Sequence, residues 1–258
     1  MSATPSDDSG EPNAIHPAAD AGYRKRSGTY EHVRPAYHPA LVARFVERYG
    51  GGRVIELGAG TGKFTRQLAA GGGVETVAVE PVAEMRARFP SDLPGVTVVV
   101  GSAERIPVDD GGAATVVAAQ AFHWFDHGPA LDEIDRVLAD GGHLVTVWNV
   151  RDNTVDWVAA KTAIIDAHAA DTPRHREMHW RSAIDADSRF DPVDDWGIDH
   201  PVPTSPQAVV DRALSTSFIA ALDPDAQDEV AARILAVVAD LGPSFPYPYR
   251  GELQAWRR

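Results

Sequence analysis

The stretch VIELGAGTGKFTRQLA, residues 54 to 69, decides the fold of this chain. It joins a short apolar run, typical of a buried strand, to a segment in which Phe64 and Leu68 recur at helical spacing. Three glycines, Gly58, Gly60 and Gly62, fill the junction. Glycine allows a tight backbone turn and lets a ligand approach the backbone closely. We therefore predict a strand, a ligand-binding turn and a helix.

Short apolar runs alternate with helical patterns on both sides of this turn. The predicted strands cover residues 53–57, 74–80, 96–100, 114–119 and 144–148, and the predicted helices cover residues 39–49, 61–70, 83–89 and 129–138. Strands that alternate with helices through short connections form a parallel sheet with both faces covered. Right-handed crossovers make such a sheet doubly wound, so we predict a doubly wound α/β fold.

The pattern is less regular beyond residue 149. We predict helices at residues 155–169, 206–215 and 224–240, and a strand at 251–256. The tract 172–200 is crowded with His, Arg, Asp and Trp, and we interpret it as an insertion or lid. His175 and His179 have the spacing of metal ligands, but Glu177 is not where the His-Glu-x-x-His motif needs its base. We therefore predict no metal site.

The composition favours a protein that acts on small molecules. The 258 residues include 37 acidic and 24 basic ones, for a net charge of −13, which disfavours nucleic acid as a partner. No apolar run is long enough to span a membrane, and residues 1–22 have the composition of a disordered tail rather than a signal peptide. Cysteine is absent, which suits a reducing cytoplasm. Both a monomer and a homodimer are compatible with these features.

Three kinds of ligand compete for the glycine turn. A phosphate-binding P-loop needs glycine where Leu57 stands and Ser or Thr where Phe64 stands. A dinucleotide fingerprint fits the first two glycines but needs a third glycine at the position of Lys63. The third pattern, acidic-x-Gly-x-Gly-x-Gly, is complete when Glu56 is included. It suits a ligand with no phosphate, such as a nucleoside that bears an amino acid, whose amino group Glu56 could receive.

Glu80 is a second acidic candidate. It ends the second predicted strand, 22 residues after Gly58. A carboxylate at this place in a doubly wound sheet can accept hydrogen bonds from both ribose hydroxyls of a nucleoside. The structural alternative is that Glu80 merely ends a strand before Pro81.

Five stretches in this order resemble the motifs of class I S-adenosylmethionine-dependent methyltransferases: VIELGAGTGKFTRQLA, VAVEP, GSAERIP, AAQAFHWFD and VLADGGHLVTVWNVRD. The N-terminal pattern Tyr-x-x-x-Arg-Pro-x-Tyr resembles that of the small-molecule subgroup that includes trans-aconitate methyltransferase, and it is met by Tyr30, Arg34, Pro35 and Tyr37. The subgroup often has Pro directly after this pattern, whereas His38 stands here.

This resemblance implies a Rossmann-like fold and a cofactor. The fold would be a mostly parallel seven-stranded sheet in a single domain of residues 23–258, with a helical lid from about residues 23–40 and 151–215. The cofactor would be S-adenosylmethionine, and the product would be S-adenosylhomocysteine. Met85 or Val82 could cover the adenine or belong to the core. By resemblance and position, the expected cofactor contacts are Glu56, Gly58, Ala59, Gly60, Glu80, Pro81, Ser102, Ala103, Glu104 and Gln120.

The acceptor is expected beside the end of the fourth strand. His123 lies just after it and is the candidate base for a protic acceptor, although a histidine among aromatic residues is also common packing. Arg34 could clamp a carboxylate of the acceptor or of the cofactor, or it could pair only with a surface Asp or Glu. Tyr30 could close the lid beside it. Methyl transfer to a small molecule is the expected reaction, and this molecule would bear a carboxylate if Arg34 clamps the acceptor. The alternatives are a cyclisation or elimination with the same cofactor, or a regulator without turnover.

Overall fold

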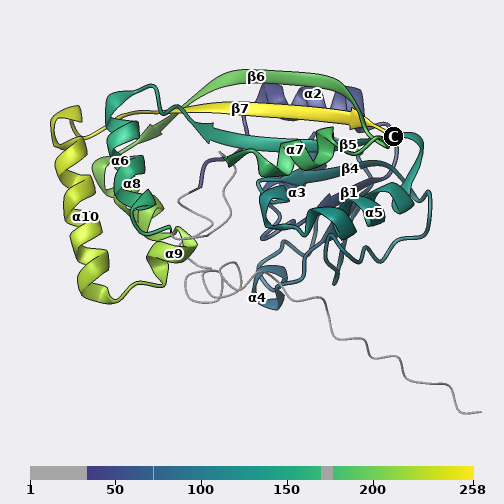
Figure 1. The fold of residues 1–258 in the computed structure, drawn as a ribbon, viewed down its shortest axis with the longest axis horizontal. Helices are drawn as coiled ribbons and strands as arrows, with labels where there is room; N and C mark the ends of the chain where they lie inside the picture. The colour runs from purple at the N-terminus through teal and green to yellow at the C-terminus, as the bar shows by residue number, and fades with distance from the viewer. Residues whose placement is uncertain (1–33, 72, 170–176) are drawn as a thin grey trace, which may run out of the picture.

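The computed structural model describes residues 34–71, 73–169 and 177–258. Seven strands form one sheet in the order β3-β2-β1-β4-β5-β7-β6 (Figure 1). Neighbouring strands from β3 to β5 are parallel, whereas β7 is antiparallel to both β5 and β6. The strands are β1 (Val54–Leu57), β2 (Thr76–Val79), β3 (Val96–Val99), β4 (Ala113–Ala119), β5 (Leu138–Arg151), β6 (Asp191–Thr204) and β7 (Phe245–Arg257).

Helices cover both faces of this sheet, as a doubly wound fold requires. On one face, α2 (Pro39–Tyr49) and α3 (Lys63–Ala70) pack their apolar sides on β1, β4, β5 and β7. On the other face, α5 (His127–Val137) and α7 (His179–Asp185) pack on β1, β4 and β5. The short helix α4 (Ala83–Arg86) and the 3-10 helix η1 (Phe122–Trp124) lie in the connections after β2 and β4. The predicted α/β fold class is confirmed.

A separate group of helices lies at one end of the molecule, which we call the helical cap (Figure 1). The cap has its own apolar core, to which β7 contributes Tyr247 and Tyr249. The strands β6 and β7 pair from Asp191 to Thr204, so they run as one long ribbon from the sheet into the cap. The cap helices are α6 (Asp156–Asp166), α8 (Pro206–Leu214), α9 (Ser217–Ala220) and α10 (Pro224–Val238), and the 3-10 helix η3 (Ala239–Leu241) follows α10.

The structure differs from the expected lid at two places. Residues 191–204 were expected in a lid or insertion, but they form β6, an edge strand of the main sheet. The cap also continues beyond residue 215, because α10 packs in the same apolar core as α6 and α8. The reason is that β7 begins at Phe245, earlier than the predicted residue 251, and draws the preceding helices onto its first half.

Within residues 34–71, 73–169 and 177–258, no helix combines the length and the apolar character needed to cross a membrane.

A carboxylate that is largely shielded from water joins helix α2 to the edge strand β6. Asp194 of β6 accepts two 2.9 Å hydrogen bonds from Nη2 of Arg44 and one of 3.0 Å from the hydroxyl of Tyr49, both in α2. The Asp194 side chain is only 9% exposed. Charged hydrogen bonds that are shielded from water contribute more than exposed ion pairs do. Asp194 therefore fixes the place of α2 on the sheet.

We predict that Asp194→Ala lowers the free energy of unfolding by about 1.5–3 kcal/mol, because charged hydrogen bonds are lost. Denaturation by urea measures this change. The matched control is Asp199→Ala on the same strand, whose carboxylate is 89% exposed and 3.3 Å from Arg250. Its cost should stay below about 1 kcal/mol. Equal costs for the two variants would contradict the role given to Asp194.

Candidate functional site

The glycine turn after β1 uses its glycines for two different purposes. Gly58 and Gly60 both have left-handed backbone conformations, with φ of +64° and +60°. A Cβ atom on Gly58 would lie 2.7 Å from Cβ of Ala121, so packing excludes a side chain there. A Cβ atom on Gly60 would meet no atom of the described residues within 4 Å. Gly58 thus brings the turn against the loop after β4, while Gly60 borders open space.

Glu80 ties this turn to the end of β2. One carboxylate oxygen accepts the backbone N–H of Gly60 at 2.8 Å, and the other accepts that of Val82 at 2.8 Å. The residue is only 5% exposed. Burial raises the pKa of Glu80, and the two N–H groups oppose that shift. Each carboxylate oxygen has a second lone pair, so Glu80 can still accept hydrogen bonds from a ligand.

Glu56 lies beneath the turn rather than at its surface. Its residue exposure is 1%, and Oε2 accepts a 2.5 Å hydrogen bond from the hydroxyl of Thr65 in α3. Burial and, to a smaller extent, the charge of Glu80 raise the pKa of Glu56 to about 8, although the hydrogen bond from Thr65 opposes this shift. A carboxyl group in this state is largely protonated at neutral pH. The expected contact of Glu56 with a cationic amino group therefore stays a prediction.

The loop after β3 has mostly structural contacts. Ser102 forms an isolated backbone bridge with Arg105, and Ala103 is buried in the core. Glu104 accepts the backbone N–H of Asp126 at 3.0 Å, which joins this loop to the one after β4. The adenine contacts expected from these residues stay predictions.

The residues after Glu80 divide between surface and core. Pro81 is partly exposed, whereas Val82 and Met85 are 5% and 2% exposed. Both apolar side chains therefore contribute to packing, and Pro81 is the one that a ligand can reach from solvent.

Gln120 occupies a strained position at the end of β4. Its φ of 62° places a non-glycine residue in the left-handed region. Such residues cost free energy and are concentrated at functional sites. The Gln120 side chain donates from Nε2 to the carbonyl of Asn149 at 3.2 Å, and its backbone N–H donates to Val147. The strained residue thus links the ends of β4 and β5.

Aromatic residues surround His123 just beyond Gln120. Its ring centroid lies 4.8 Å from that of Trp124 and 5.6 Å from that of Trp148. Trp148 is fully buried, whereas His123 and Trp124 are partly exposed. His123 can therefore be reached from solvent while its ring orientation is fixed by the tryptophans.

The chain before α2 lies over the glycine turn and the end of β5. Lys63, at the start of α3, donates to the carbonyl of Arg34 at 2.6 Å. Asn149 donates from Nδ2 to the carbonyl of Ala36 at 3.2 Å, and His200 lies 2.9 Å from the same oxygen. Arg34 is thereby held near the predicted cofactor turn. Tyr30 lies outside the described residues, as does His175.

The predicted residues meet at the carboxyl edge of the parallel strands. Glu80 contacts Gly60, Gly58 packs against the loop after β4, and Gln120 contacts Asn149. Sequence reasoning missed Asn149 and Lys63 as residues that hold the N-terminal segment. The signal for Asn149 was a polar residue directly after the apolar run of β5, the same signal that singled out Glu80 and Gln120.

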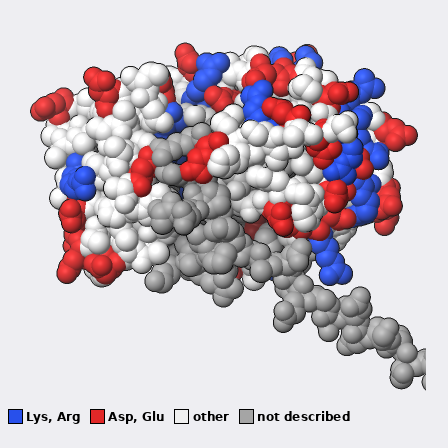
Figure 2. All heavy atoms as spheres, in the orientation of Figure 1, with Lys and Arg blue, Asp and Glu red and all other residues white. Residues whose placement is uncertain are grey.

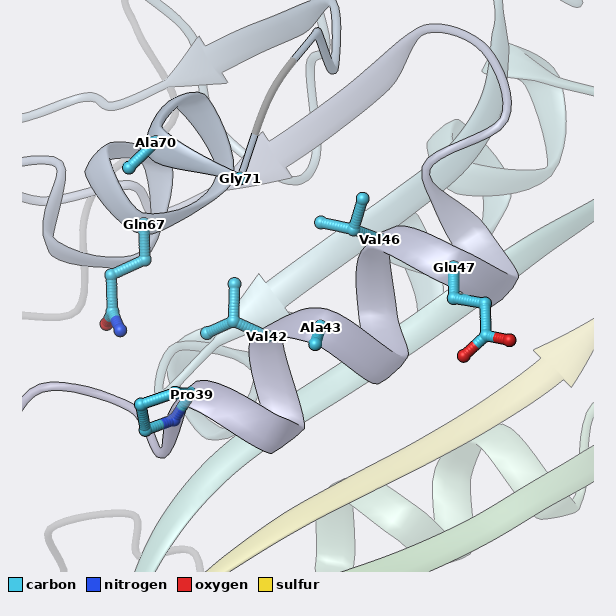
Figure 3. Close-up of a pocket in the computed structure, with 8 residues that line it drawn as sticks. All are labelled: Pro39, Val42, Ala43, Val46, Glu47, Gln67, Ala70 and Gly71. Atoms are coloured by element: carbon cyan, nitrogen blue, oxygen red, sulfur yellow. The ribbon is translucent and has the colours of Figure 1, made fainter.

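A groove between α2 and α3 lies apart from this edge (Figure 3). Val42 and Val46 point from α2 toward α3, and none of the predicted catalytic or cofactor residues lines the groove. The described residues also hold no group of three His, Asp or Glu side chains placed to bind a metal ion. The carboxyl edge is therefore the candidate site.

Charges of both signs mix on the surface. Figure 2 shows Lys and Arg side chains interspersed with Asp and Glu at the end of the molecule that holds the sheet. A nucleic-acid-binding face would gather basic side chains into a patch or stripe. Among the described residues, the face shown in Figure 2 has no such patch or stripe of basic side chains.

The family model and the relatives that match this chain are all methyltransferases. Residues 55–146 match the methyltransferase domain family. An uncharacterised methyltransferase of Mycobacterium tuberculosis is 36% identical over 191 residues, which cover 74% of this chain and 74% of that protein. An uncharacterised methyltransferase of Schizosaccharomyces pombe is 37% identical over 140 residues, which cover 53% of this chain and 56% of that protein.

Solved structures share the fold at low sequence identity. The YcgJ protein from Bacillus subtilis has a TM-score of 0.55 and 16% identity, over 86% of this chain and 99% of its own. The (4+2) cyclase SpnF has a TM-score of 0.59 and 15% identity, over 97% of this chain and 99% of its own. These likenesses support the Rossmann-like fold and nothing finer.

The raised pKa of Glu56 predicts a pH-dependent stability. Its carboxyl group binds a proton up to about pH 8 in the folded chain, against an ordinary value of 4.5. The folded state therefore holds more protons between these values, and stability must fall as pH rises through this window. Relative to Glu56→Gln, the wild type should lose on the order of 3 kcal/mol of unfolding free energy between pH 5 and pH 8.

Denaturation of both proteins at the two pH values measures this difference, in which the titration of other groups largely cancels. A difference that does not change with pH would contradict the assigned protonation of Glu56.

Proposed function

This chain belongs to the methyltransferase family, and from that premise we propose that it transfers a methyl group from S-adenosylmethionine to a small-molecule acceptor. The observation that carries the proposal is the glycine turn held by Glu80 beside open space. The products would be the methylated acceptor and S-adenosylhomocysteine.

The residues present fit this cofactor. Gly60 leaves room where a side chain would otherwise project, and the partly exposed Pro81 lies next to a carboxylate with spare acceptor capacity. We propose that Gly58, Ala59 and Gly60 hold the methionine part and that Glu80 holds the ribose. The adenine would lie against the loop of Ser102, Ala103 and Glu104. When bound, the cofactor supplies an electrophilic methyl group on a sulfonium.

The chain's own residues would align the acceptor and exclude water. Methyl transfer is a displacement at carbon, in which position and desolvation matter more than strong acid or base catalysis. Gln120 and the aromatic cluster at His123 border the end of β4, where the acceptor must meet the methyl group. His123 would take the proton of a protic acceptor, and a carboxylate acceptor would need no such step.

A second candidate function has the same fold. SpnF, a (4+2) cyclase, shares the fold of this chain, so the fold alone does not decide between methyl transfer and cyclisation. Product analysis separates the two reactions. A methylated product with one equivalent of S-adenosylhomocysteine supports methyl transfer, whereas a rearranged product with intact S-adenosylmethionine supports the alternative.

Calorimetric titration of the full chain with S-adenosylmethionine, S-adenosylhomocysteine and NADH tests the proposed cofactor. We expect the first two compounds to bind and NADH not to bind. Binding of NADH alone would show that the glycine turn belongs to a dehydrogenase. Binding of none of the three would refute the proposed cofactor.

Glu80→Ala should weaken the binding of S-adenosylhomocysteine about 10- to 150-fold, since charged hydrogen bonds of about 1.5–3 kcal/mol are lost. Because Glu80 also holds two backbone N–H groups, part of this loss could come from the turn itself. The analogue that lacks both ribose hydroxyls controls for that effect. The affinity for this analogue should fall less in the variant than the affinity for S-adenosylhomocysteine, because only the effect on the turn remains. An equal loss for both ligands would contradict the ribose contact.

His123→Ala should lower turnover about 10²- to 10⁴-fold with a protic acceptor, while the affinity for S-adenosylhomocysteine stays the same. Transfer of a labelled methyl group across a panel of small hydroxyl, amine and carboxylate compounds measures this effect. His143→Ala is the control. His143 lies on β5 and packs beside Tyr49 of α2, away from the candidate site. Full activity of His123→Ala with every protic acceptor would leave His123 a packing role only.

A further inference from the structure

We propose that the acceptor site binds a small organic anion with at least two negative charges, held by Lys161, Arg212 and Arg151. The proposal rests on the proposed function in one respect, because it identifies this anion with the methyl acceptor. The three residues come from α6, α8 and the end of β5, and none of them belongs to the predicted cofactor site.

The side chain of Lys161 is buried, and it forms no ion pair with another described residue. The residue is 1% exposed, and its Nζ lies 3.1 Å from the neutral hydroxyl of Tyr247. Within the described parts of the chain, no carboxylate lies within ion-pair distance of this ammonium group. Burial of an ammonium costs several kcal/mol unless an opposite charge compensates it. Apolar packing alone would be better served by Leu or Met at this position.

Two arginines share the surroundings of Lys161. The guanidinium carbon of Arg212 lies 5.2 Å from the ring centroid of Tyr249, whose ring stacks on that of Tyr247 at 4.4 Å. Arg151 is the partner of Tyr249 in the antiparallel pairing of β5 and β7, so both side chains lie on the same face of the sheet. Lys161 and Arg212 therefore each lie beside one of the two stacked tyrosines, and Arg151 lies opposite Tyr249 in the sheet.

The electrostatics of this cluster agree with its geometry. Burial lowers the pKa of Lys161, and the charges of Arg151, Arg212 and Arg34 lower it further, while Asp166 acts in the opposite direction. Burial likewise lowers the pKa of Arg212. Like charges in this arrangement repel each other, and a bound anion would relieve the repulsion. Because several cations contribute, a ligand with two or more negative charges fits better than a monoanion.

Lys161, Arg212 and Arg151 lie where the cap meets the carboxyl end of β5. Arg151 follows Asn149 by two residues, and Asn149 accepts the hydrogen bond of the strained Gln120. Arg34, whose charge acts on Lys161, is held by Lys63 at the start of α3. Figure 1 shows the carboxyl end of β5 pointing toward α6 and α8 of the cap. An anion held by the cap would thus face the carboxyl edge of the sheet.

Calorimetric titration of the full chain with citrate, inorganic phosphate and acetate, at constant ionic strength, tests the site. We expect citrate or phosphate to bind, and acetate to bind at least about tenfold more weakly because it has one charge. Preference for citrate identifies a polycarboxylate ligand, and preference for phosphate identifies a phosphorylated one. The proposal is overturned if neither citrate nor phosphate binds, or if acetate binds as well as they do.

Lys161→Met tests whether the anion binds at this site or is attracted only by the overall charge of the protein. It replaces a buried ammonium by an apolar side chain of similar length, so the fold should stay as stable or become more stable. We expect the affinity for the preferred anion to fall more than about tenfold in this variant and in Arg212→Met. The control is Arg250→Met on β7, because the Arg250 side chain is 51% exposed. Unchanged affinity in Lys161→Met, or an equal loss in Arg250→Met, would overturn the proposal.

The anion titration does not depend on the cofactor, so the two proposals fail separately. Binding of citrate without binding of S-adenosylmethionine would keep the anion site and refute the proposed reaction. Binding of S-adenosylmethionine without any anion would leave the reaction standing and refute the anion site.

Discussion

A single buried carboxylate, that of Glu80, holds the candidate site together. It accepts one N–H group from the glycine turn after β1 and one from the chain after β2, so two loops that are far apart in sequence depend on one side chain. The left-handed glycines alone would leave the turn free to adopt other shapes. The carboxylate selects one shape and leaves Gly60 bordering open space. Packing of Gly58 then places the loop after β4, and with it Gln120 and His123.

The ribbon of β6 and β7 fixes the position of the cap, as Glu80 fixes the position of the loops. Leu253 and Ala255 of β7 belong to the core of the sheet, whereas Tyr247 and Tyr249 of the same strand belong to the core of the cap. One continuous strand therefore sets the position of the cap relative to the sheet. The positions of Lys161 and Arg212, which lie on cap helices beside these tyrosines, depend on this strand as well.

The sequence was informative where local pattern decides structure and uninformative where distant contacts decide it. The alternation from β1 to β5 was predicted because buried parallel strands are apolar and bounded by glycine or proline. Strand β6 was missed because it contains three prolines and is rich in Asp, a composition that only an edge strand tolerates. The grouping of Lys161 with Arg212 was also missed, since fifty residues separate them and only the cap brings them together. A lysine in the apolar stretch AAKTAII was the available hint.

The composition of β6 also bears on how copies of this chain can associate. Most edge strands are templates for pairing with another strand, and charge or proline blocks such pairing. Strand β6 contains three prolines, which lack an N–H group, and four aspartates, which would repel a second β6. The opposite edge, β3, has only four residues. The composition of β6 therefore disfavours growth of the sheet by strand addition at this edge.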